Sequence, residues 1–598
     1  MPSTPTTLIA LTDEALKKNA NKVAVAVKRN GEWIETSPDE FREKIENLAY
    51  GLYDLGVRPG DKVSIHSENS TEWLIVDQAV LSLGAVVVPI YTTQPGDQIQ
   101  YILENSEAKV HIVSNDEIFA ETKPLIKNCT GVIAIITMCD SKHGKLKSFN
   151  DILDLGAEKK QDNPGLIEKL IAEVKPDDLA TLIYTSGTTG VPKGVMLSHN
   201  NIASNVLASM KVFPFKKEDF EDPKVLSYLP LAHVFERTAS YIYIHMNIPI
   251  YYIEEISEIR DDFLYVKPVY LVTVPRLLEK IVTGIKVKGQ ELSGLKKKLY
   301  YWAVKMAENY DPETPKSALY KAKWGIADKL VYSKIKELFG GRIIGMNVGG
   351  AALSPSIARF INGIGLYCGL GYGLTETSPV LTGPPIGEMR IGSSGKVLDG
   401  IQVRIAEDGE IQAKGPNVMS GYYKLPDKTA EVFTEDGWFC TGDIGYLDED
   451  GFLFITDRKK SLFKLSTGKY VAPQNIENSL VTSGFIDQAL VIGNEHKFCA
   501  ALIVPDWVNV QKRFEKHGHV LPEEGRGTNE HVLNRIQKEI DKTNAQLPKW
   551  ETIKRFRIIE EPFSIEKGEI TPSLKLKRNV ICERYADQIK AIYKDEHQ

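Results

Sequence analysis

The sequence predicts an α/β fold: a large N-terminal domain of helix-wrapped β-sheets that includes a β-rich subdomain, followed by a small, mobile α+β C-terminal domain. Helical and strand-like patterns alternate from residue 39 to about 116 and again further along the chain, which is typical of a parallel sheet covered by helices. Short β-like runs follow residue 392, and strands mix with helices after residue 458. At 598 residues the chain is too long for one hydrophobic core, because single cores stop growing near roughly 250 to 300 residues.

The N-terminal elements repeat one order of helix and strand. FREKIENLAYGLYDLG has helical spacing and ends at Gly56, and DKVSIHS after it predicts a strand. WLIVDQAVLSLGA predicts the next helix and VVVPIY the next strand. Three later apolar runs predict further strands of the same kind: Lys224–Leu229, Pro268–Val272 and Arg342–Val348.

A helical region between about residues 277 and 339 is rich in lysine. LKKKLYYWAVKMAENY and YKAKWGIADKLVYSKIKELF carry lysines well in excess of acidic residues. Basic amphipathic helices lie on anionic membrane surfaces, but a solvated helical insertion packed on the rest of the protein gives the same pattern. Both interpretations stay open at this point.

The sequence pattern changes after about residue 392, from alternating helix and strand to short β-like runs. Val397–Ile405, Gly409–Lys414 and Phe452–Asp457 are β-like runs, with hairpin signals at the two Asp-Gly pairs 408–409 and 450–451. We therefore expect a β subdomain over about 392–456 that completes a large domain of residues 1–456. A hinge at Asp457, in the charged stretch 456–460, precedes a C-terminal domain of residues 457–598, where 488–492 and 500–504 predict strands and 532–544 predicts a helix.

Composition excludes several classes of protein. A formal net charge of -6 and a pI of about 6.1 argue against a nucleic-acid-binding surface. The six cysteines form no C-x-x-C pair, so they signal neither a zinc site nor a disulfide framework. The N-terminus has no basic region followed by an apolar core, and the longest apolar stretch, 79–91, is shorter than the roughly 20 residues of a membrane span. We expect a cytoplasmic protein, with peripheral contact at the inner membrane surface left open.

Residues 184–194 read YTSGTTGVPKG and directly follow the apolar run Leu179–Ile183. A Walker-type phosphate loop has the pattern G-x-x-x-x-G-K-[ST], in which the lysine meets the terminal phosphates and the hydroxyl binds Mg²⁺. Counted from Gly187, the last three positions hold proline, Lys193 and glycine, so the lysine is present and the hydroxyl is absent. The loop predicts phosphate binding with a metal ligand that comes from elsewhere.

Two later motifs supply the missing parts. In GYGLTETSP, residues 371–379, Tyr372 offers a flat face for an adenine ring and Glu376 offers a hard oxygen ligand for Mg²⁺. In CTGDIG, residues 440–445, the Asp443 carboxylate is suited to accept both ribose hydroxyls. Each motif alone also fits an ordinary turn.

The three motifs occur in this order and are followed by DRKK at 457–460 and LKLKR at 574–578. Together they resemble the adenylate-forming superfamily of acyl-CoA synthetases, peptide-synthetase adenylation domains and luciferases, from about residue 39 to residue 578. YLPLAHVFERT, VGGAALSP, the lysine-rich region and GEITPSLKLKR are similar to the long-chain fatty acid-CoA ligases in particular. Amino-acid-activating members place an Asp early in the acyl pocket, where this chain has His233 and Phe235.

This resemblance implies an ATP-dependent ligase that activates a fatty acid, expected to be long-chain, to acyl-AMP and transfers the acyl group to coenzyme A, releasing AMP and pyrophosphate. ATP, Mg²⁺ and coenzyme A are the implied cofactors, and no nucleic-acid partner is implied. The alternatives are an acyl-AMP ligase that loads a carrier protein and a non-catalytic nucleotide-binding scaffold of the same fold. Acyl chain length and oligomeric state are not predicted.

The resemblance also implies roles for individual residues. Glu376, with Thr185, would coordinate Mg²⁺, Thr375 would bond the α-phosphate, and Asp443 would hold the ribose. The implied residues of the ATP and AMP site are Thr185, Ser186, Gly187, Thr188, Thr189, Gly190, Lys193, Gly350, Ala351, Gly371, Tyr372, Thr375, Asp443, Arg458 and Lys460.

Lys575 matches the family's adenylation lysine, which bridges the attacking carboxylate and the α-phosphate, and with Glu376 and Thr375 it forms the implied catalytic set. Many relatives carry Ser-Gly before this lysine, whereas Ser573-Leu574 stands here, so Lys577 is a competing candidate. Rotation about the hinge would withdraw Lys575 and bring the segment 464–470 toward the thiol. Lys464, Lys469 and Lys460 would contact the phosphates of the nucleotide or of coenzyme A, or would be solvent-exposed surface charge. The implied acyl and coenzyme A region consists of His233, Lys464, Gly468 and Lys469.

Overall fold

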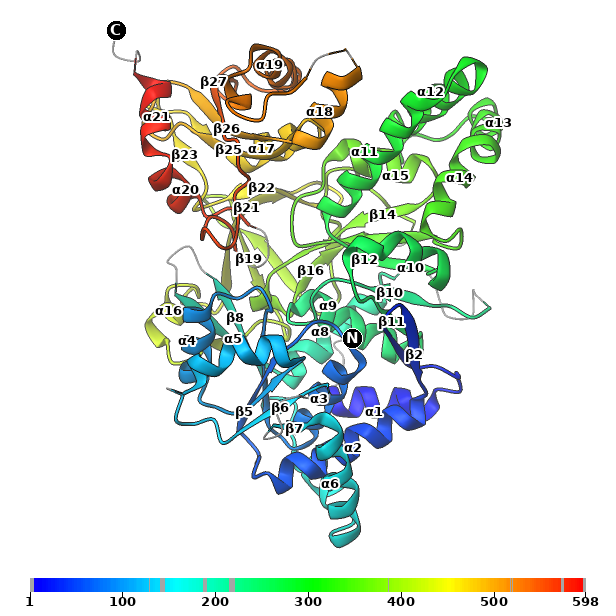
Figure 1. Ribbon diagram of the computed structural model, residues 1–598, viewed down its shortest axis with the longest axis vertical. Helices are drawn as coiled ribbons and strands as arrows, with labels where there is room; N and C mark the ends of the chain where they lie inside the picture. The colour runs from blue at the N-terminus through cyan, green and yellow to red at the C-terminus, as the bar shows by residue number, and fades with distance from the viewer. Residues whose placement is uncertain are drawn as a thin grey trace.

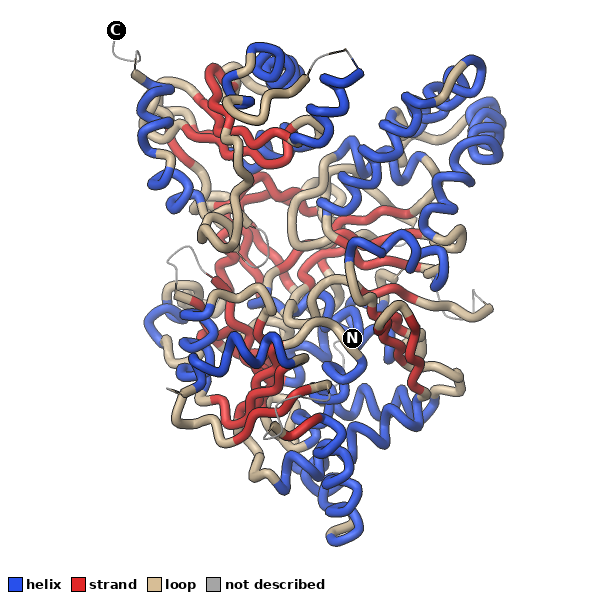
Figure 2. Tube along the Cα trace, viewed as in Figure 1, coloured by secondary structure: helices blue, strands red, loops and turns tan. Residues whose placement is uncertain are grey.

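The computed structural model describes residues 5–127, 129–139, 146–186, 191–213, 221–385, 387–516, 518, 520–571 and 575–594. Two large sheets with their helices form the body of the molecule, and the C-terminal elements lie above it in Figure 1, beside a projecting group of helices. Figure 2 shows the alternation of helix and strand along the trace. The predicted α/β fold class with a large and a small domain is confirmed.

Two sheets dominate the described part of the large domain. In spatial order the first contains β14 (Tyr367–Leu370), β13 (Gly345–Val348), β12 (Tyr270–Thr273), β10 (Val225–Ser227), β11 (Ile250–Tyr252), β1 (Val25–Arg29) and β2 (Glu32–Thr36). The second contains β20 (Gly421–Tyr422), β9 (Pro192–Ser198), β8 (Leu179–Ser186), β4 (Val86–Ile90), β3 (Lys62–His66), β5 (Ala108–Val113), β6 (Ala134–Thr137) and β7 (Lys147–Ser148). Most pairs are parallel, while β1–β2, β8–β9 and β9–β20 are antiparallel.

Helices cover both sheets. The large domain contains α1 (Leu8–Lys18), α2 (Pro38–Asp54), α3 (Thr71–Ser82), α4 (Gly96–Ser106), α5 (Asp116–Ile126), α6 (Phe149–Asp162), α7 (Leu166–Glu173), α8 (His199–Met210), α9 (Val234–His245), α10 (Ile259–Val266), α11 (Pro275–Glu291), α12 (Gly294–Glu308), α13 (Ala318–Ala327), α14 (Ser333–Lys336), α15 (Pro355–Gly363) and α16 (Pro426–Ala430). The predicted helices before Gly56 and after residue 71 are α2 and α3. The predicted strands from DKVSIHS, VVVPIY and the three later runs are β3, β4, β10, β12 and β13.

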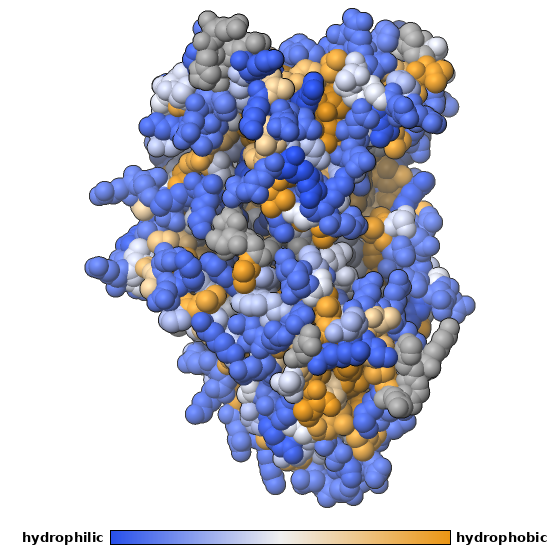
Figure 3. All heavy atoms as spheres, turned by 60° about the vertical axis from the view of Figure 1, so that its left-hand side comes forward, coloured by the Kyte–Doolittle hydropathy of each residue, from blue (hydrophilic) through white to orange (hydrophobic). Residues whose placement is uncertain are grey.

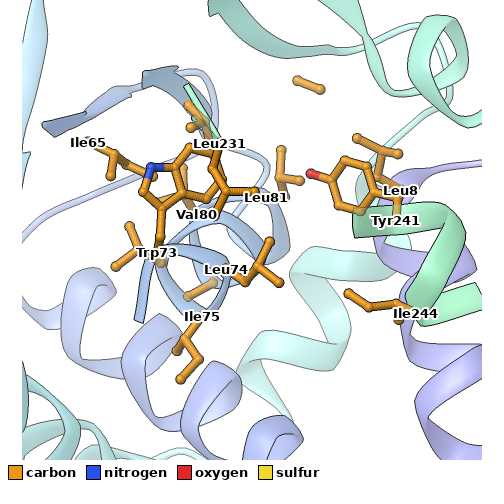
Figure 4. Packing of buried hydrophobic residues seen from close by; sticks show 14 of the residues in the cluster. Leu8, Ile65, Trp73, Leu74, Ile75, Val80, Leu81, Leu231, Tyr241 and Ile244 are labelled. Carbon is orange, nitrogen blue, oxygen red and sulfur yellow. The ribbon is translucent and has the colours of Figure 1, made fainter. Parts of the chain in front are cut away.

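The main hydrophobic core lies between the two sheets. It joins residues of α3, α8 and α9 to strands of both sheets. Figure 4 shows Leu74 and Leu81 of α3 on the side of Tyr241 and Ile244 of α9, with the Trp73 ring near Ile65 and Leu231. The face of α9 that enters this core carries a charged residue, Arg237, which is fully buried. A second core lies on the other side of the first sheet, under α10, α11, α12 and α15.

Hydrogen bonds satisfy the buried Arg237 guanidinium and link α9 to its neighbours. It donates to Asp77 of α3, to the Thr181 hydroxyl of β8 at 2.8 Å and to the Tyr241 hydroxyl at 3.2 Å, and Tyr241 donates to Asp77. A buried charge is tolerated only when it is paired and hydrogen-bonded in this way. The network fixes α9 against β8, the strand that leads into the 184–194 loop.

The residues after 371 build smaller sheets, as the β subdomain prediction requires. These sheets consist of β15 (Tyr372–Gly373) with β16 (Val380–Gly383) and β17 (Lys396–Val397), and of β18 (Gln402–Ile405) with β19 (Glu410–Lys414), β21 (Phe439–Leu447) and β22 (Leu453–Arg458). The two predicted Asp-Gly turns are present, with φ of +84° at Gly409 and +81° at Gly451, a conformation that favours glycine.

One predicted strand was wrong. Val397–Ile405 is divided between β17 and β18, which belong to different sheets, by a turn in which Gly400 has φ of +81° and the Ile401 N–H donates to the Leu398 carbonyl. The apolar character of Leu398 and Ile401 comes from their burial in a separate small core, which periodicity cannot distinguish from a strand.

The C-terminal part has its own core and sheet. It contains β23 (Phe463–Lys464), β24 (Tyr470–Val471), β25 (Ile486–Ile492), β26 (Cys499–Pro505) and β27 (Ile553–Ile558), with α17 (Pro473–Val481), α18 (Trp507–Lys516), α19 (Glu530–Asn544), α20 (Arg578–Arg584) and α21 (Ala586–Tyr593). The predicted hinge residue, Asp457, lies within β22, where Asp457 and Arg458 are the last two residues and pair with Ile444 and Asp443. Asp457 is buried, and burial raises the pKa of its carboxyl to about 6.

Figure 3 shows the face on which the left-hand side of Figure 1 comes forward. Most of this face is hydrophilic, and apolar surface gathers mainly toward its lower end. Within the described residues, none of the helices is both long enough and apolar enough to cross a membrane.

Candidate active site

Parallel strands bring distant segments together at one edge of the first sheet. The segments after β10, β12, β13 and β14 hold His233, Val274, Gly350 and Gly371, and all of them leave the carboxyl ends of neighbouring strands. Gly371 donates its backbone N–H to the Val348 carbonyl at 2.9 Å, so the loops after β13 and β14 are in direct contact. Ligands bind at the carboxyl ends of strands in open α/β sheets, which places a binding site here.

The predicted adenine residues line this edge. Gly350, with φ of +78°, and Ala351 are exposed directly after β13, and Tyr372 starts β15 after Gly371. Gly349 packs so closely on the Phe235 ring that an added Cβ would lie 2.7 Å from it. The edge therefore offers exposed backbone at residues 350–351 and the aromatic ring of Tyr372, which suit a flat ligand.

The phosphate side of the site is built on the β8–β9 hairpin. Thr185 of β8 lies opposite Lys193 of β9 in the register, and Ser186 ends β8. The remaining predicted loop residues, Gly187, Thr188, Thr189 and Gly190, lie outside the described residues. Lys193 lies 4.9 Å from the centre of the Tyr422 ring, and the Tyr422 hydroxyl donates to Glu376 at 2.9 Å. The hairpin lysine and the predicted metal ligand are thus joined through one tyrosine.

Burial and neighbouring cations lower the pKa of Lys193. Desolvation is the main cause, and the charges of Lys460 and Lys428 act in the same direction. Lys460 is therefore close enough to Lys193 to repel it. A cluster of cations that repel one another is stabilised by a polyanion, so these lysines suit the phosphates of ATP.

Glu376 and Thr185 fit Mg²⁺. One Glu376 oxygen accepts the Tyr422 hydroxyl, which orients the carboxylate, and the other has no hydrogen-bond donor among the described residues. No group of three or more His, Cys, Asp or Glu side chains suited to a metal occurs in the described residues. Because Mg²⁺ is commonly held by one or two carboxylates with substrate phosphates completing the shell, one carboxylate and one hydroxyl beside a phosphate loop are a fitting set.

Asp443, the residue predicted to hold the ribose, lies on β21. Its carboxylate is buried and accepts the Tyr372 hydroxyl at 2.8 Å and Arg458 Nε at 2.9 Å. Burial and the nearby Asp443 raise the pKa of the Tyr372 hydroxyl far above its ordinary value, which keeps it a donor. The structure therefore brings together three predicted residues from three motifs, Tyr372, Asp443 and Arg458.

Lys575 enters this site from the C-terminal domain. Lys575 is exposed, yet surrounding protein is close enough that desolvation lowers the pKa of its ammonium. Arg458 lowers this pKa further, while Asp443 and Glu376 raise it. Lys575 is thus within electrostatic reach of both predicted carboxylates, and the competing Lys577 instead begins α20, with its N–H on the Glu569 carbonyl.

His233, which was predicted to belong to the acyl and coenzyme A region, lies at the start of α9. It caps α9, and its Nδ1 accepts the Phe235 N–H at 3.1 Å. Burial, assisted by the charge of Lys575, lowers the pKa of the imidazole to about 4. The ring is therefore neutral at pH 7, and because Nδ1 accepts, its proton is on Nε2.

Three predicted residues do not reach the site. Lys464, Gly468 and Lys469 form the exposed β23–β24 hairpin, where Lys464 lies over the Tyr470 ring and Lys469 over the Trp550 ring. Thr375 begins the short 3-10 helix at 375–377 beside Glu376, and no hydrogen bond of its side chain is present among the described residues.

Tyr422 lies between Lys193 and Glu376 but is not predicted from the sequence. It lies in GYYKLP, which has no charged or nucleophilic constellation, and its two contacts reach residues 46 and 229 positions earlier in the chain. Only the pairing of β20 with β9 puts it between Lys193 and Glu376.

Comparisons with known proteins agree with this geometry. The sequence model of the AMP-binding enzyme family matches residues 12–423, and that of the AMP-binding enzyme C-terminal domain matches residues 460–597. The chain is 33% identical over 576 residues to long-chain-fatty-acid–CoA ligase FadD15 of Mycobacterium bovis, covering 95% of this chain and 94% of that one. It is also 33% identical to the peroxisomal long chain acyl-CoA synthetase 6 of Arabidopsis thaliana, covering 92% of this chain and 80% of that one.

Solved structures share the fold at lower identity. The adenylation domain of a carboxylate reductase from Mycobacterium chelonae superposes with a TM-score of 0.75 at 23% identity, covering 99% of this chain and 92% of that one. The anthranilate CoA ligase AuaEII in complex with anthranoyl-AMP gives a TM-score of 0.71 at 18% identity, with 98% of each chain covered.

Proposed function

The chain belongs to the AMP-binding enzyme family, and we propose on this basis that it is an AMP-forming acid–thiol ligase that converts a long-chain fatty acid, ATP and coenzyme A into acyl-CoA, AMP and pyrophosphate. The observation that carries the proposal is the convergence of Lys575 with Glu376 and Asp443, three residues from two domains, at the carboxyl edge of the first sheet.

The first step joins two anions, so its main requirement is positive charge at the reacting atoms. A carboxylate oxygen of the fatty acid attacks the α-phosphorus, and the bond from that phosphorus to the oxygen bridging to the β-phosphorus breaks as pyrophosphate leaves. We assign Lys575 to the space between the carboxylate and the α-phosphate. Its lowered pKa reflects an ammonium held without an anion, so the two anionic reactants stabilise it where the protein alone does not.

The other residues hold and orient ATP. We assign Lys193, Lys460 and residues 185–190 to the β- and γ-phosphates, and Thr375 to the α-phosphate. Asp443 and Arg458 are assigned to the ribose. Residues 350–351 and 371–372 are assigned to the adenine. Mg²⁺, held by Glu376 and Thr185, would neutralise phosphate charge during the transfer. Tyr422 keeps the Glu376 carboxylate oriented.

The second step requires another arrangement of the C-terminal domain. The thiol sulfur of coenzyme A attacks the acyl carbonyl carbon, AMP leaves, and the thiol proton passes to solvent. We propose that rotation at the end of β22, near Asp457, removes Lys575 and brings the hairpin with Lys464, Gly468 and Lys469 to the site. The division into residues 1–456 and 457–598 is part of this proposal.

The proposed setting is the cytoplasm, with peripheral contact at the inner membrane surface, where long-chain acids are dissolved. His233 and Phe235, at the start of α9, are assigned to the head of the acyl pocket.

Product formation across acid chain lengths tests the proposal. With ATP, Mg²⁺ and coenzyme A, acids from C2 to C20 should give AMP and a thioester, with the highest kcat/KM among the long chains. If no acid in this range yields AMP, the enzyme assignment is wrong. A thioester formed on a carrier protein but not on coenzyme A would favour the carrier-loading alternative.

A further inference from the structure

The helices α11 to α13 project from the body of the large domain beside the C-terminal part (Figure 1) and differ from the rest of the molecule in charge. Residues 277–339 hold 13 lysines against 7 acidic residues, whereas the whole chain has a formal net charge of -6. Residues 277–339 thus have a formal net charge of +6, and the remainder of the chain has a formal net charge of -12.

Apolar side chains are exposed on the same helices. Leu295 on α12 is 81% exposed, and Leu319 and Ile326 on α13 are 65% and 53% exposed. Tyr301 on α12 and Leu330, just after α13, are also exposed. We call these five residues, together with five lysines of the same helical region, the arm surface; the lysines are Lys296, Lys298, Lys321, Lys323 and Lys329.

α13 is apolar on two sides, and only one of them packs on the protein. Tyr320, Trp324 and Ala327 turn inward, with Ala327 fully buried and Trp324 Nε1 donating to the Gly363 carbonyl at 2.8 Å. Leu319, Ala322, Ile326 and Leu330 recur every three or four residues on the opposite, exposed side. A helix that only had to pack on the enzyme would need the first side alone.

The lysines of the arm surface flank this exposed stripe and are not neutralised. Lys321, Lys323 and Lys329 are exposed, and within the described residues none of the arm-surface lysines forms an ion pair, although Lys286 and Lys336 nearby do. Long lysine side chains keep their charge in the aqueous layer while neighbouring apolar groups enter a bilayer.

We propose that the arm surface docks the enzyme on bilayers that contain anionic lipid, with Leu295, Leu319 and Ile326 inserted and the lysines on the lipid phosphates. This extends the proposed function by naming the surface and the lipid chemistry. The arm is also continuous with the candidate site, because α11 begins one residue after Val274, whose Cγ1 would lie 3.8 Å from a Cβ at Gly350. A bound bilayer would therefore supply its dissolved acid close to the pocket.

Vesicle co-sedimentation of the full chain tests the docking. Wild type should bind phosphatidylcholine vesicles that contain about one third phosphatidylglycerol, and should bind pure phosphatidylcholine vesicles weakly, since each lysine near an anionic surface favours binding roughly fivefold. The triple variant Lys321→Gln, Lys323→Gln, Lys329→Gln should bind the anionic vesicles about a hundredfold more weakly. The double variant Leu319→Ser, Ile326→Ser should bind the anionic vesicles at least tenfold more weakly than wild type.

Matched variants elsewhere control for charge and hydrophobicity. Lys127→Gln, Lys169→Gln, Lys175→Gln removes three exposed lysines of the large domain, and Val508→Ser removes an apolar side chain that is 63% exposed. Both should bind like wild type. Equal losses in the control and arm variants, or no binding of wild type to anionic vesicles, would overturn the proposal.

Two further readouts separate the remaining outcomes. Activity with a water-dissolved medium-chain acid, without vesicles, should be the same in wild type and the arm variants, so a failure of docking is distinguishable from a failure of the proposed function. Sedimentation velocity without lipid should show the same mass for all. A dimer that only the arm variants lose would show that the arm surface binds a second copy of the chain instead.

Discussion

The two halves of the active site are held in different ways. In the nucleotide half, formed by Tyr372, Glu376, Tyr422 and Asp443, every side chain takes part in a hydrogen bond within the large domain. Lys575 sits on a C-terminal loop whose backbone bonds to Thr571 in the same domain, and its ammonium has no hydrogen-bond acceptor among the described residues. In the proposed mechanism, the groups needed in both reaction steps are therefore fixed, while the group needed in one step is attached through the domain proposed to rotate.

A large effect on the use of ATP is expected in the fixed half. Glu376→Gln keeps an acceptor for the Tyr422 hydroxyl but removes the charge, so we expect kcat/KM for ATP to fall about a hundredfold or more and the Mg²⁺ requirement to rise. Steady-state kinetics at varied Mg²⁺ measure both. Tyr422→Phe is the control: it keeps the charge, removes one hydrogen bond and should cost about tenfold or less. If Tyr422→Phe proved as damaging as Glu376→Gln, orientation rather than charge would be the main role of this carboxylate.

A smaller effect is expected where the two domains touch. Arg276 of α11 forms an ion pair with Asp487 of β25, and Thr283 of α11 packs near Gly484. Both charged side chains are partly exposed, so the pair is worth at most about 1 kcal/mol. Arg276→Ala should slow adenylation two- to fivefold, because it weakens the arrangement that inserts Lys575, and should leave thioester formation from supplied acyl-AMP unchanged.

A charge reversal makes that test sharper. Arg276→Asp with Asp487→Arg should recover most of the adenylation rate lost in either single variant, as a double-mutant cycle would measure. Lys17→Ala removes the exposed Lys17–Asp13 pair of α1 and should have no effect. Failure of the double variant to recover would mean that the contact does not stabilise this domain arrangement.

The smallest effect on catalysis is expected at Glu236, in the core behind His233. Its carboxyl is buried, one oxygen accepts the Ser227 hydroxyl and the other has no partner among the described residues, and burial raises its pKa to about 8. Between the ordinary pKa of 4.5 and 8 the unfolded chain releases this proton while the folded protein keeps it, so stability falls as pH rises, by at most about 1.4 kcal/mol per pH unit.

Glu236→Gln removes that pH dependence. Its free energy of unfolding relative to wild type should increase steadily from pH 5 to pH 8 in denaturant titrations, with kcat nearly unchanged. A difference that is constant with pH would show that Glu236 is ionised in the folded protein.

The sequence predicts the fixed half of the site better than the movable half. Lys193, Glu376 and Asp443 lie in short motifs that can be recognised in the sequence, and in the structure they lie near the start of β9, just after β15 and within β21. Tyr422 escapes detection because only strand pairing brings it to Lys193. The choice between Lys575 and Lys577 depends on how one domain rests on the other, which no local pattern encodes.

In the fold, too, local patterns predict some elements correctly, and features that depend on pairing between distant segments are not predicted. Helices and strands with strong periodicity, such as α2, α3, β3 and β4, lie where the pattern predicts them. The β17–β18 run was predicted as one strand because apolar residues of a buried turn look like a strand. The end of β22 extends past the predicted hinge because Asp457 and Arg458 pair with β21, and a charged DRKK segment gives no sign of that pairing.

The division of labour between the two halves is tested most directly by measuring Lys575→Ala in the two half-reactions separately, with Lys577→Ala beside it. We predict that Lys575→Ala lowers acyl-AMP formation, measured by pyrophosphate exchange, about a thousandfold and leaves the conversion of supplied acyl-AMP to acyl-CoA within about threefold of wild type, with Lys577→Ala close to wild type in both. Equal loss of both half-reactions in Lys575→Ala, or the selective loss in Lys577→Ala, would contradict the account.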